Sequence, residues 1–468
     1  MVLPVSRMGS RVAMIPPFSK IDSRALLACA VAAFGGFPFG FDQGTFSGAQ
    51  IFIHQYFHMT PLTFGCTTSA MTLGGFLATI GGIGLQEHFG ARKCLTAAAI
   101  LLTIGSLCAA SVSNAWALAV FRMLSGMGIG IISIASPAYI AEIAPPARRG
   151  RLGLIYQLLL AVGSLLGFAL SWLLASTLSP HLVWRFLLGS TAVPSLILLL
   201  LSRYIPASPR WLLIRGREAE ALAIIRTIRN VEQAEAELAA MRIDSPKKEG
   251  SHRDLLGPGV RWAMLTGVLL GLFGNWTGGT GIGPYLPLIF QRGGFPAASN
   301  ALAVVLLLSC VYLGFVMVST RLVDCVGRRT LWMSTAGGMA LSMASLGLVF
   351  HAGATGAVIV GLILLIVISH GLGLGPLPGL MISELYAGPL RTRAISICTA
   401  VVWLSGFSSV LMYPSLAAWS QRWIGSMAGP FWVYAGMSLL ALVFGWRLLP
   451  ETRGKTLEEI TRYFHCRV

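Results

Sequence analysis

The stretch Gly35–Gly48, with the sequence GGFPFGFDQGTFSG, lies within the first long apolar run of this 468-residue chain. It contains Asp42, and a carboxyl group at such a depth is costly enough to indicate a functional role. Arg122 is the other ionisable residue that lies well inside an apolar run. We therefore predict that these two side chains meet. The glycines and Pro38 around Asp42 predict an interrupted helix that lines a cavity.

The composition is that of an integral membrane protein. Hydrophobic residues make up 55% and charged residues 11% of the chain, whereas soluble proteins carry roughly 25% charged residues. When the loops are assigned alternately to the two sides of a membrane, nearly all Lys and Arg fall on one side, with only Arg185, Arg292 and Arg422 on the other. This asymmetry predicts that the side rich in Lys and Arg faces the cytoplasm. We attribute the net charge of +17 to the basic loops on the cytoplasmic side and to their contact with anionic membrane lipids. We expect no nucleic-acid partner.

Motifs for metals, nucleotides and covalent catalysis are missing from the sequence. The eight cysteines are scattered, without a Cys-x-x-Cys pair or a Cys/His spacing that fits zinc. No strand-linked phosphate loop with a Walker-type lysine is present. We therefore expect no metal, no cofactor and no enzymatic activity. The N-terminal segment Met1–Arg24 is polar and basic, which predicts that no signal peptide is removed.

Twelve runs are long enough to cross a membrane as helices, which takes about 20 mostly apolar residues each. They are 25–48, 63–86, 95–113, 115–140, 152–175, 182–203, 260–290, 297–320, 330–351, 355–385, 392–416 and 428–449. The charged segment 204–259, with helical periodicity over Glu218–Arg242, separates six runs from six. An even number of spans after a basic N-terminus places both termini in the cytoplasm.

These runs predict an all-α membrane protein with twelve transmembrane helices in two pseudo-symmetric six-helix bundles. Residues 1–203 form the N-terminal bundle, 204–259 a cytoplasmic helical linker, 260–449 the C-terminal bundle and 450–468 a cytoplasmic tail.

Three charge motifs occur once in each half of the chain and in the same order. Glu87–Lys93 (EHFGARK) corresponds to Asp324–Arg329 (DCVGRR). Glu142 followed by Arg149 corresponds to Glu384 followed by Arg391, and Pro206–Arg210 (PASPR) corresponds to Pro450–Gly454 (PETRG). A repeat of this kind predicts two related bundles with a solute site near the midplane between them.

Over essentially its full length the chain resembles the sugar porter family of the major facilitator superfamily. The residues that carry the resemblance are Gly35–Gly48, Arg122, Tyr139–Arg151 (YIAEIAPPARRGR), Gln157, Pro206–Arg217, Asp324–Arg329 and Pro450–Ile460. The resemblance implies the major facilitator fold, with two six-helix bundles that work by alternating access around one central solute site. Ala91 and Ala207 depart from the family pattern, which usually has arginine and glutamate at these positions.

The cytoplasmic charge motifs place carboxylates and arginines at helix ends on one side of the membrane. The C-terminal set is Asp324, Arg328, Arg329, Glu384 and Arg391, and the N-terminal set is Glu87, Arg92, Glu142 and Arg149. We predict that the members of each set pair with one another, latch the bundles when the cytoplasmic side is closed, and separate when it opens. The alternative is that these exposed ion pairs, worth roughly 0–1 kcal/mol each, only anchor helix ends.

Asp42 and Arg122 predict proton coupling. Burial favours the protonated form of a carboxyl group and a nearby guanidinium favours its charged form, so a balanced site can load a proton on one side and release it on the other. Arginine stays charged, which leaves Asp42 as the titrating partner. We expect charged Asp42 to hold Arg122, and protonation from outside to release Arg122 and permit solute binding. The resemblance implies the same role; the alternative is a static pair that stabilises the fold.

The resemblance also implies solute-contacting residues. Gln157 matches a sugar-contacting glutamine on helix five, and Phe39 matches an aromatic residue on helix one. Helix seven departs from the family, with Gly274 and Asn275 in place of two glutamines, Thr280 in place of an asparagine and Pro284 in place of a tyrosine. On helix ten, Gly379 replaces a tryptophan, and helix eleven lacks the usual asparagine. The residues that we predict to contact solute are Phe39, Gln157, Asn275, Thr277, Thr280, Tyr285, His370 and Trp403. For His370 and Trp403, helix packing is the alternative.

The lost amide side chains and the lost indole predict a cavity that is larger and less polar than a hexose site. We predict a proton-coupled symporter of a sugar or sugar-like solute, such as a bulkier sugar, a glycoside, a polyol or a cyclic acid. We expect no further Lys or Arg in the cavity, which argues against a strongly anionic solute. We expect a monomeric, multi-pass protein of a plasma membrane or bacterial inner membrane. The alternatives are a facilitative uniporter, an exporter, and a transporter-like nutrient sensor.

Overall fold

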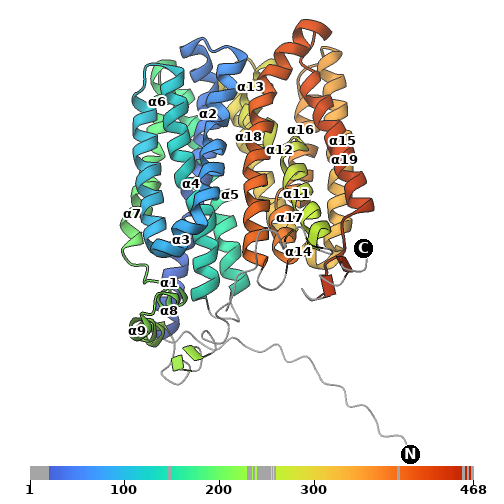
Figure 1. Cartoon of the computed structure of the whole chain (residues 1–468). Helices are drawn as coiled ribbons and strands as arrows, with labels where there is room; N and C mark the ends of the chain where they lie inside the picture. Colours follow the sequence, from blue (N-terminus) through green and yellow to red (C-terminus); the bar gives the residue numbers. More distant parts are fainter. Residues whose placement is uncertain are drawn as a thin grey trace, which may run out of the picture.

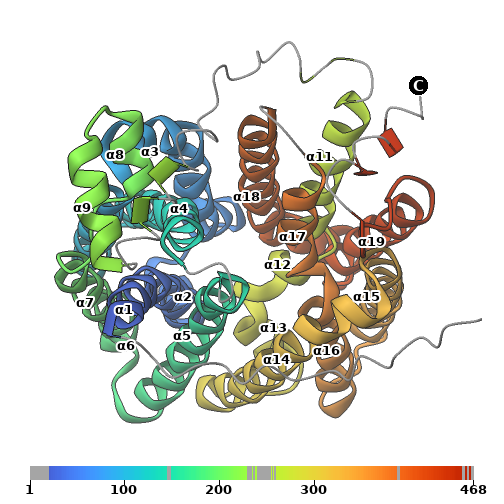
Figure 2. The same ribbon diagram turned by 90° about the horizontal axis from the view of Figure 1, so that it is seen from below.

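The structure is a computed structural model of the chain, and it describes residues 20–144, 149–228, 260–386 and 390–455. It also describes a few short pieces beyond them, namely 234–235, 238–239, 255, 257, 459–460 and 463–464. The described residues form helices and their connections, without a strand (Figure 1). Seen end-on, the helices form two groups that face each other across the middle of the molecule (Figure 2).

The N-terminal group contains the first seven helices. They are α1 (Lys20–Phe34), α2 (Gly36–Phe57), α3 (Pro61–Ser111), α4 (Ala115–Ile143), α5 (Arg149–Thr177), α6 (Pro180–Ser190) and α7 (Ala192–Ser202). Two short helices of the linker follow, α8 (Pro209–Ile214) and α9 (Glu218–Ile228). The predicted helix Glu218–Arg242 is confirmed for its first 11 residues, and most of the rest lies outside the described residues.

The C-terminal group contains the remaining elements. They are α11 (Val260–Trp276), α12 (Gly279–Ile282), the 3₁₀ helix η3 (Gly283–Tyr285), α13 (Leu286–Arg292), α14 (Ala298–Val326), α15 (Arg328–His351), α16 (Ala357–Ser369), the π-helix η4 (His370–Leu374), α17 (Leu377–Glu384), α18 (Arg391–Ile424) and α19 (Gly429–Arg447). The seventh crossing is thus the broken succession from α11 to α13, and the tenth contains a π-helical turn between α16 and α17.

The predicted twelve-helix membrane fold is confirmed, although the limits of its helices differ from the prediction. Among the described residues, ten stretches are helical, long and apolar enough to span a membrane by themselves. The second crossing is the first part of α3, and the seventh is the broken succession that begins with α11. The predicted break around Glu87–Lys93 is confirmed, because the backbone at Gly90, with φ 77° and ψ 157°, is not helical and divides α3 into two crossings.

The glycines of the opening stretch pack α2 against α5. They are Gly36, Gly40, Gly44 and Gly48, four residues apart and therefore on one face of α2. A Cβ atom on Gly40 would lie only 1.8 Å from the carbonyl oxygen of Leu160 on α5, an approach that small residues allow between membrane helices. The predicted interruption around Asp42 is wrong. The chain breaks at Gly35, between α1 and α2, and Asp42 lies inside continuous helix.

The first repeated charge motif has the same backbone shape in both halves. Gly90 has φ 77° and ψ 157°, and Gly327 has φ 98° and ψ 154°, a conformation that is essentially restricted to glycine. A Cβ atom on Gly90 would lie 3.1 Å from the Trp211 ring, and one on Gly327 would lie 2.6 Å from the Glu451 carboxylate. Each bend is therefore covered by a residue from the segment that follows the last helix of its own half.

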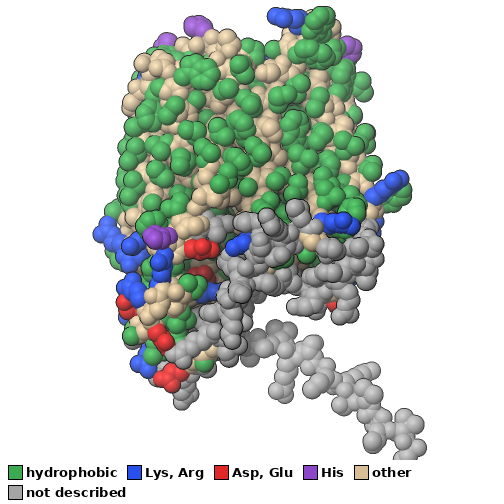
Figure 3. Space-filling model, viewed as in Figure 1, with side chains coloured by type: hydrophobic (Ala, Val, Ile, Leu, Met, Phe, Trp, Pro, Cys, Tyr) green, Lys and Arg blue, Asp and Glu red, His purple; other side chains and the backbone are tan. Residues whose placement is uncertain are grey.

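Charged side chains gather at one end of the molecule, which we call the charged end and which carries Glu87, Arg92 and Asp324 (Figure 3). The sides are largely hydrophobic, as a bilayer requires. The opposite end, which we call the histidine end, carries His54, His58, His181 and His351.

The two groups of helices contact each other between the middle of the molecule and the histidine end. Ser47 Oγ on α2 donates a hydrogen bond of 3.1 Å to the carbonyl oxygen of Pro284 in η3. The Phe64 ring on α3 packs edge-on against Tyr285, with 5.4 Å between ring centroids. These contacts join the first and second crossings to the broken seventh crossing.

Candidate functional site

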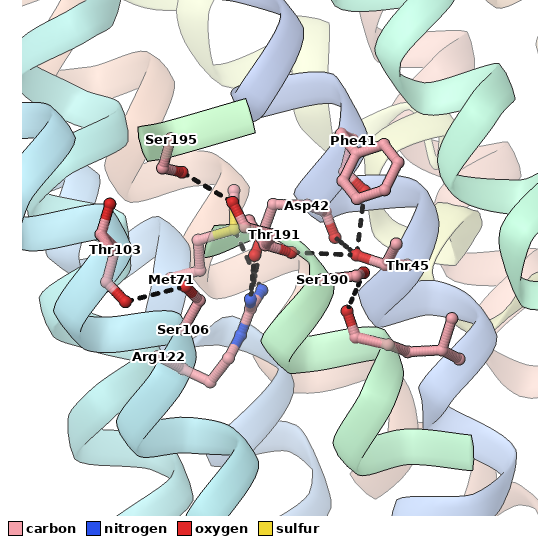
Figure 4. Close-up of polar contacts among 11 residues, drawn as sticks. Phe41, Asp42, Thr45, Met71, Thr103, Ser106, Arg122, Ser190, Thr191 and Ser195 are labelled. Carbon is pink, nitrogen blue, oxygen red and sulfur yellow. Dashed lines mark hydrogen bonds and ion pairs between the residues drawn. The ribbon is translucent and has the colours of Figure 1, made fainter. Parts of the chain in front are cut away.

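Asp42 on α2 and Arg122 on α4 form a buried ion pair (Figure 4). Arg122 Nη1 donates hydrogen bonds to both carboxylate oxygens of Asp42, at 2.7 and 2.8 Å. Asp42 is 1% exposed and Arg122 is 2% exposed. The prediction that these two groups meet is therefore confirmed.

The other partners of Arg122 are weak. Its guanidinium lies 3.7 Å from the centroid of the Phe46 ring, and Nη2 donates to the sulfur of Met71 at 3.0 Å, a poor acceptor. Nε has no hydrogen-bond partner among the described residues. Asp42 is thus the group that neutralises the guanidinium. Removing one partner of such a buried pair costs about 3–5 kcal/mol, so the charge of Asp42 and the local structure are tightly linked.

Two of the predicted solute-contacting residues meet across the two groups of helices. The rings of Phe39 on α2 and Trp403 on α18 stack, with 6.0 Å between centroids and 29° between planes. Trp403 also packs against α3, where a Cβ atom on Gly75 would lie 2.4 Å from the indole. The aromatic pair lies three residues along α2 from Asp42, so a solute stacked on it would be near the ion pair.

The predicted residues of the seventh crossing differ in how free their polar groups are. The Asn275 amide donates to the Val402 carbonyl and to Ser405 Oγ, both at 2.9 Å, so this amide already binds α11 to α18. The fully buried Tyr285 hydroxyl donates to the Val410 carbonyl at 2.9 Å.

Four other predicted residues have polar groups without a hydrogen bond among the described residues. The Thr277 hydroxyl is buried and unpaired, whereas Thr280 is half-buried. His370 opens the π-helix η4 and stacks on Tyr312, and its Nδ1 is buried without a partner. Gln157 on α5 is half-buried. Thr280, His370 and Gln157 can therefore offer hydrogen bonds to a solute at small cost to the fold.

The predicted charge network of the C-terminal half forms in part. Arg328 bridges Asp324 at 3.1 Å and Glu384 at 3.2 Å. Among the residues that the structure describes, Arg329 and Arg391 form no ion pair with a carboxylate. Arg329 Nε donates to the Gly445 carbonyl at 3.1 Å and Arg391 to the Ser383 carbonyl at 3.3 Å, both in the last turns of their helices.

The predicted network of the N-terminal half is different. Glu142 accepts a short hydrogen bond from the Ser208 hydroxyl rather than an ion pair from Arg92. Arg92 instead donates to the Arg203 carbonyl at 3.3 Å, and the Glu87 carbonyl accepts from Trp211 Nε1 at 2.8 Å. The side chain of Arg149 lies outside the part of the chain that the structure describes. The exposed positions of Glu87 and Arg92 explain why they do not reach the half-buried Glu142.

The sequence reasoning missed the hydroxyl groups that complete both networks. Ser208 donates to Glu142, and Thr452 donates to Glu384 at 2.6 Å. Glu451 also caps the bend, accepting from the backbone N–H groups of Arg328 and Arg329 at 2.9 and 3.1 Å. The signal was available, because these residues belong to the third repeated motif.

Comparison with known proteins agrees with this architecture. A family model described as "Sugar (and other) transporter" matches residues 28–464. The chain belongs to this sugar transporter family. This family member is 33% identical over 451 residues to the arabinose-proton symporter of Bacillus subtilis, with 93% of this chain and 94% of the relative covered. It is 29% identical over 471 residues to the D-xylose-proton symporter of Escherichia coli, with 92% and 94% covered.

A solved structure of the Escherichia coli xylose transporter, in a partially occluded inward open conformation, is similar to this sugar transporter family member with a TM-score of 0.81. The sequence identity is 26%, and the alignment covers 93% of this chain and 100% of the other. The protein is accordingly a multi-pass membrane transporter of the major facilitator fold.

Proposed function

We propose that this sugar transporter is a symporter that couples entry of a proton, carried by Asp42, to uptake of a sugar or sugar-like solute. The observation that carries the proposal is the buried pair of Asp42 and Arg122, at 2.7 Å. Two relatives over nearly the whole chain are named proton symporters of arabinose and of xylose. A buried carboxylate with one strong partner is the kind of group whose proton uptake changes protein conformation.

The transport cycle follows from the two charge states of Asp42. While Asp42 is charged, it neutralises Arg122 and ties α2 to α4. When Asp42 takes a proton, Arg122 keeps its charge and is left with Phe46 and the Met71 sulfur, which cannot neutralise it. The helices then rearrange to rehydrate or re-pair the guanidinium, and solute binding favours the rearranged state. A membrane potential of 100 mV adds about 2.3 kcal/mol for each positive charge that moves inward.

The solute site lies between the two groups of helices. Phe39 and Trp403 stack across them and offer aromatic faces for a ring, and Gln157, Thr280 and His370 offer hydrogen bonds. The long amides of helix seven are absent, and positions such as Gly283 and Gly379 have open space beside the backbone. These features support a solute larger or less polar than a simple hexose.

The contacts between the groups near the histidine end, and the likeness to an inward open structure, support an inward-facing state. The histidine end then faces outward and the termini lie in the cytoplasm. The two carboxylates Glu142 and Glu384 are held within their own halves, by Ser208 and by Arg328 with Thr452. In the outward-facing state these residues approach across the closed charged end and latch it.

Uptake into proteoliposomes tests the proposal. With an inward proton gradient, the wild-type protein accumulates labelled D-xylose or L-arabinose, and a protonophore abolishes the accumulation. Asp42→Asn abolishes accumulation but retains counterflow exchange, because solute binding and alternating access persist. Glu220→Gln is the matched control, since the Glu220 side chain is 55% exposed in an ion pair with Arg217, and it keeps proton-driven accumulation.

A facilitative uniporter is the main alternative and makes a different prediction for the same experiment. Uphill accumulation by Asp42→Asn at the wild-type level, or wild-type transport that ignores the proton gradient, refutes coupling through Asp42. Solute binding without any flux supports a nutrient sensor instead.

A further inference from the structure

The histidine end carries cationic and titratable groups without a carboxylate to balance them. Its described connections, residues 55–62, 112–115, 177–182, 291–298, 350–357 and 424–429, contain no Asp or Glu. The basic and histidine side chains at this end are His54, His58, His181, Arg185, Arg292, His351 and Arg422. Figure 3 shows blue and purple side chains along the top of the molecule and no red. The potential at this end is therefore positive, and it attracts anions.

A cavity of about 630 Å³ opens among these groups. Its walls come from both groups of helices, with His54 and Phe64 on one side and Arg292, His351 and Tyr413 on the other. It lies apart from Asp42 and Arg122, which do not line it. The volume exceeds that of a monosaccharide and leaves room for the water that surrounds a charged ligand.

Arg292 keeps donors that the described residues do not use, whereas His351 Nδ1 lies 3.4 Å from the Ser426 hydroxyl. Among the described residues, Arg292 makes one hydrogen bond, to the Met427 sulfur at 2.6 Å, a weak acceptor that carries no charge. The side chains of Arg292 and His351 are exposed. Arg185, on the same end, differs because it donates to the Ala110 carbonyl at 2.8 Å and stacks on Trp184. Arg292 is thus placed as an anion-binding group, while Arg185 serves the fold.

Aromatic rings complete the walls. Tyr285 and Tyr413 stack face to face at 4.6 Å, and Phe64 packs against Tyr285. These three rings are at most 6% exposed and pack against one another, so they form a rigid wall and leave no free face for a ligand. The guanidinium of Arg292 can form paired hydrogen bonds with a carboxylate. A cavity with room for a sugar and a guanidinium in its wall together fit one chemical class, a sugar that carries a single carboxylate.

We propose that this cavity is an outer recruitment site for sugar monoacids, uronates or aldonates, with Arg292 as the carboxylate-binding residue. As a binding site it stands on its own observations. The further claim that a solute binds here before it enters the central site rests on the proposed function. A single carboxylate also agrees with the absence of further Lys or Arg expected in the central cavity, since that absence disfavours only strongly anionic solutes.

Equilibrium binding to the purified full-length protein in nanodiscs tests the site. The probes are D-glucuronate and its neutral counterpart D-glucose, measured by calorimetry. We expect glucuronate to bind at least roughly 10-fold more tightly than glucose, and Arg292→Gln to weaken glucuronate binding roughly 10-fold to 100-fold, as loss of a charge-assisted hydrogen bond implies. Glucose binding stays within about twofold in the same variant.

Arg422→Gln is the matched control. It removes the same charge from the same end but lies beside a separate cavity of about 350 Å³. We expect it to leave glucuronate affinity within about twofold. Equal losses in both variants identify a diffuse surface potential and overturn the site, as does equal affinity of the wild-type protein for the two probes. An unchanged affinity in Arg292→Gln places the glucuronate elsewhere and also overturns it.

Ionic strength gives a second readout that does not depend on folding of a variant. Raising salt from about 0.1 M to about 1 M shortens the Debye length from about 10 Å to about 3 Å, so attraction by distant charges disappears and a direct Arg292–carboxylate contact persists. Glucuronate preference that vanishes entirely at high salt counts against the site. None of these measurements involves a proton gradient, so failure of proton coupling in Asp42→Asn and failure of this site are separate results.

Discussion

The exchange of Asp42 for asparagine leaves a buried cation without its counter-charge. Arg122 loses two hydrogen bonds of 2.7 and 2.8 Å to a carboxylate and keeps contacts with Phe46 and the Met71 sulfur. Water cannot replace the carboxylate while the pair is 1–2% exposed. We expect the free energy of unfolding to fall by about 3–5 kcal/mol, the cost of breaking a buried pair from one side.

The two single variants should differ in severity. Arg122→Met leaves Asp42 buried, but Asp42 can take up a proton and become neutral, which relieves part of the cost. In Asp42→Asn the cost of the buried charge is not relieved in this way, because Arg122 keeps its charge. We therefore expect Asp42→Asn to be the less stable of the two.

The double variant Asp42→Asn/Arg122→Met removes both charges at nearly constant volume. Replacement of a whole buried pair is often neutral or stabilising, so we expect a free energy of unfolding within about 2 kcal/mol of the wild-type value. The three variants then give a coupling energy well above about 0.5 kcal/mol, the limit within which independent sites are additive.

Unfolding by SDS in mixed micelles, followed by circular dichroism, measures these free energies. Asp324→Asn is the control, and its highly exposed carboxylate should contribute less than about 1 kcal/mol. Losses in the single variants that simply add up in the double variant, with a coupling energy under about 0.5 kcal/mol, would show that the two groups do not depend on each other. The proposed proton switch would then lose its energetic basis.

Three further variants test other parts of the structure. Gly40→Ala would put a methyl group 1.8 Å from the Leu160 carbonyl oxygen, so we expect a loss of about 1–3 kcal/mol in thermal unfolding in detergent; Gly153→Ala, with open space around it, should lose nothing. Trp403→Ala removes the stack on Phe39, worth about 0.5–1.5 kcal/mol, and should weaken solute binding in calorimetry while leaving proton-driven uptake detectable. Glu384→Gln breaks a partly exposed pair worth under about 1 kcal/mol and should lower the uptake rate while the unfolding temperature barely moves; unchanged uptake would favour anchoring over gating.

The contact between Asp42 and Arg122 could be predicted from the sequence for a simple reason. Each is an isolated charge in apolar surroundings, and only an opposite charge can offset such burial. The pairing of Arg328 with Glu384 was also predictable, since the motif and its repeat put both groups at helix ends on one side of the membrane.

Other features could not be predicted because the decisive partner carries no charge or side-chain signal. Glu142 accepts from the Ser208 hydroxyl and Arg92 donates to a backbone carbonyl. Counting charges identifies neither partner, although the third repeated motif does mark the segment that contains Ser208. Glycine permits both a break and a close approach, so the sequence of α2 did not reveal which of the two its glycines provide. The structure shows close packing, because the carbonyl oxygen of Leu160 lies directly against Gly40.

The first and seventh crossings occupy equivalent places in the repeat, yet the first consists of two long helices that join at Gly35 and the seventh is a succession of shorter ones. In the first crossing, α2 packs along α5. In the seventh, α11 and α12 are separated at Gly278, with φ 104°, and η3 and α13 follow α12. The C-terminal half therefore contains a crossing that bends more easily than its counterpart in the N-terminal half. Distance probes within the N-terminal half should report a single rigid body through the cycle, whereas probes on either side of Gly278 should report bending inside the C-terminal half.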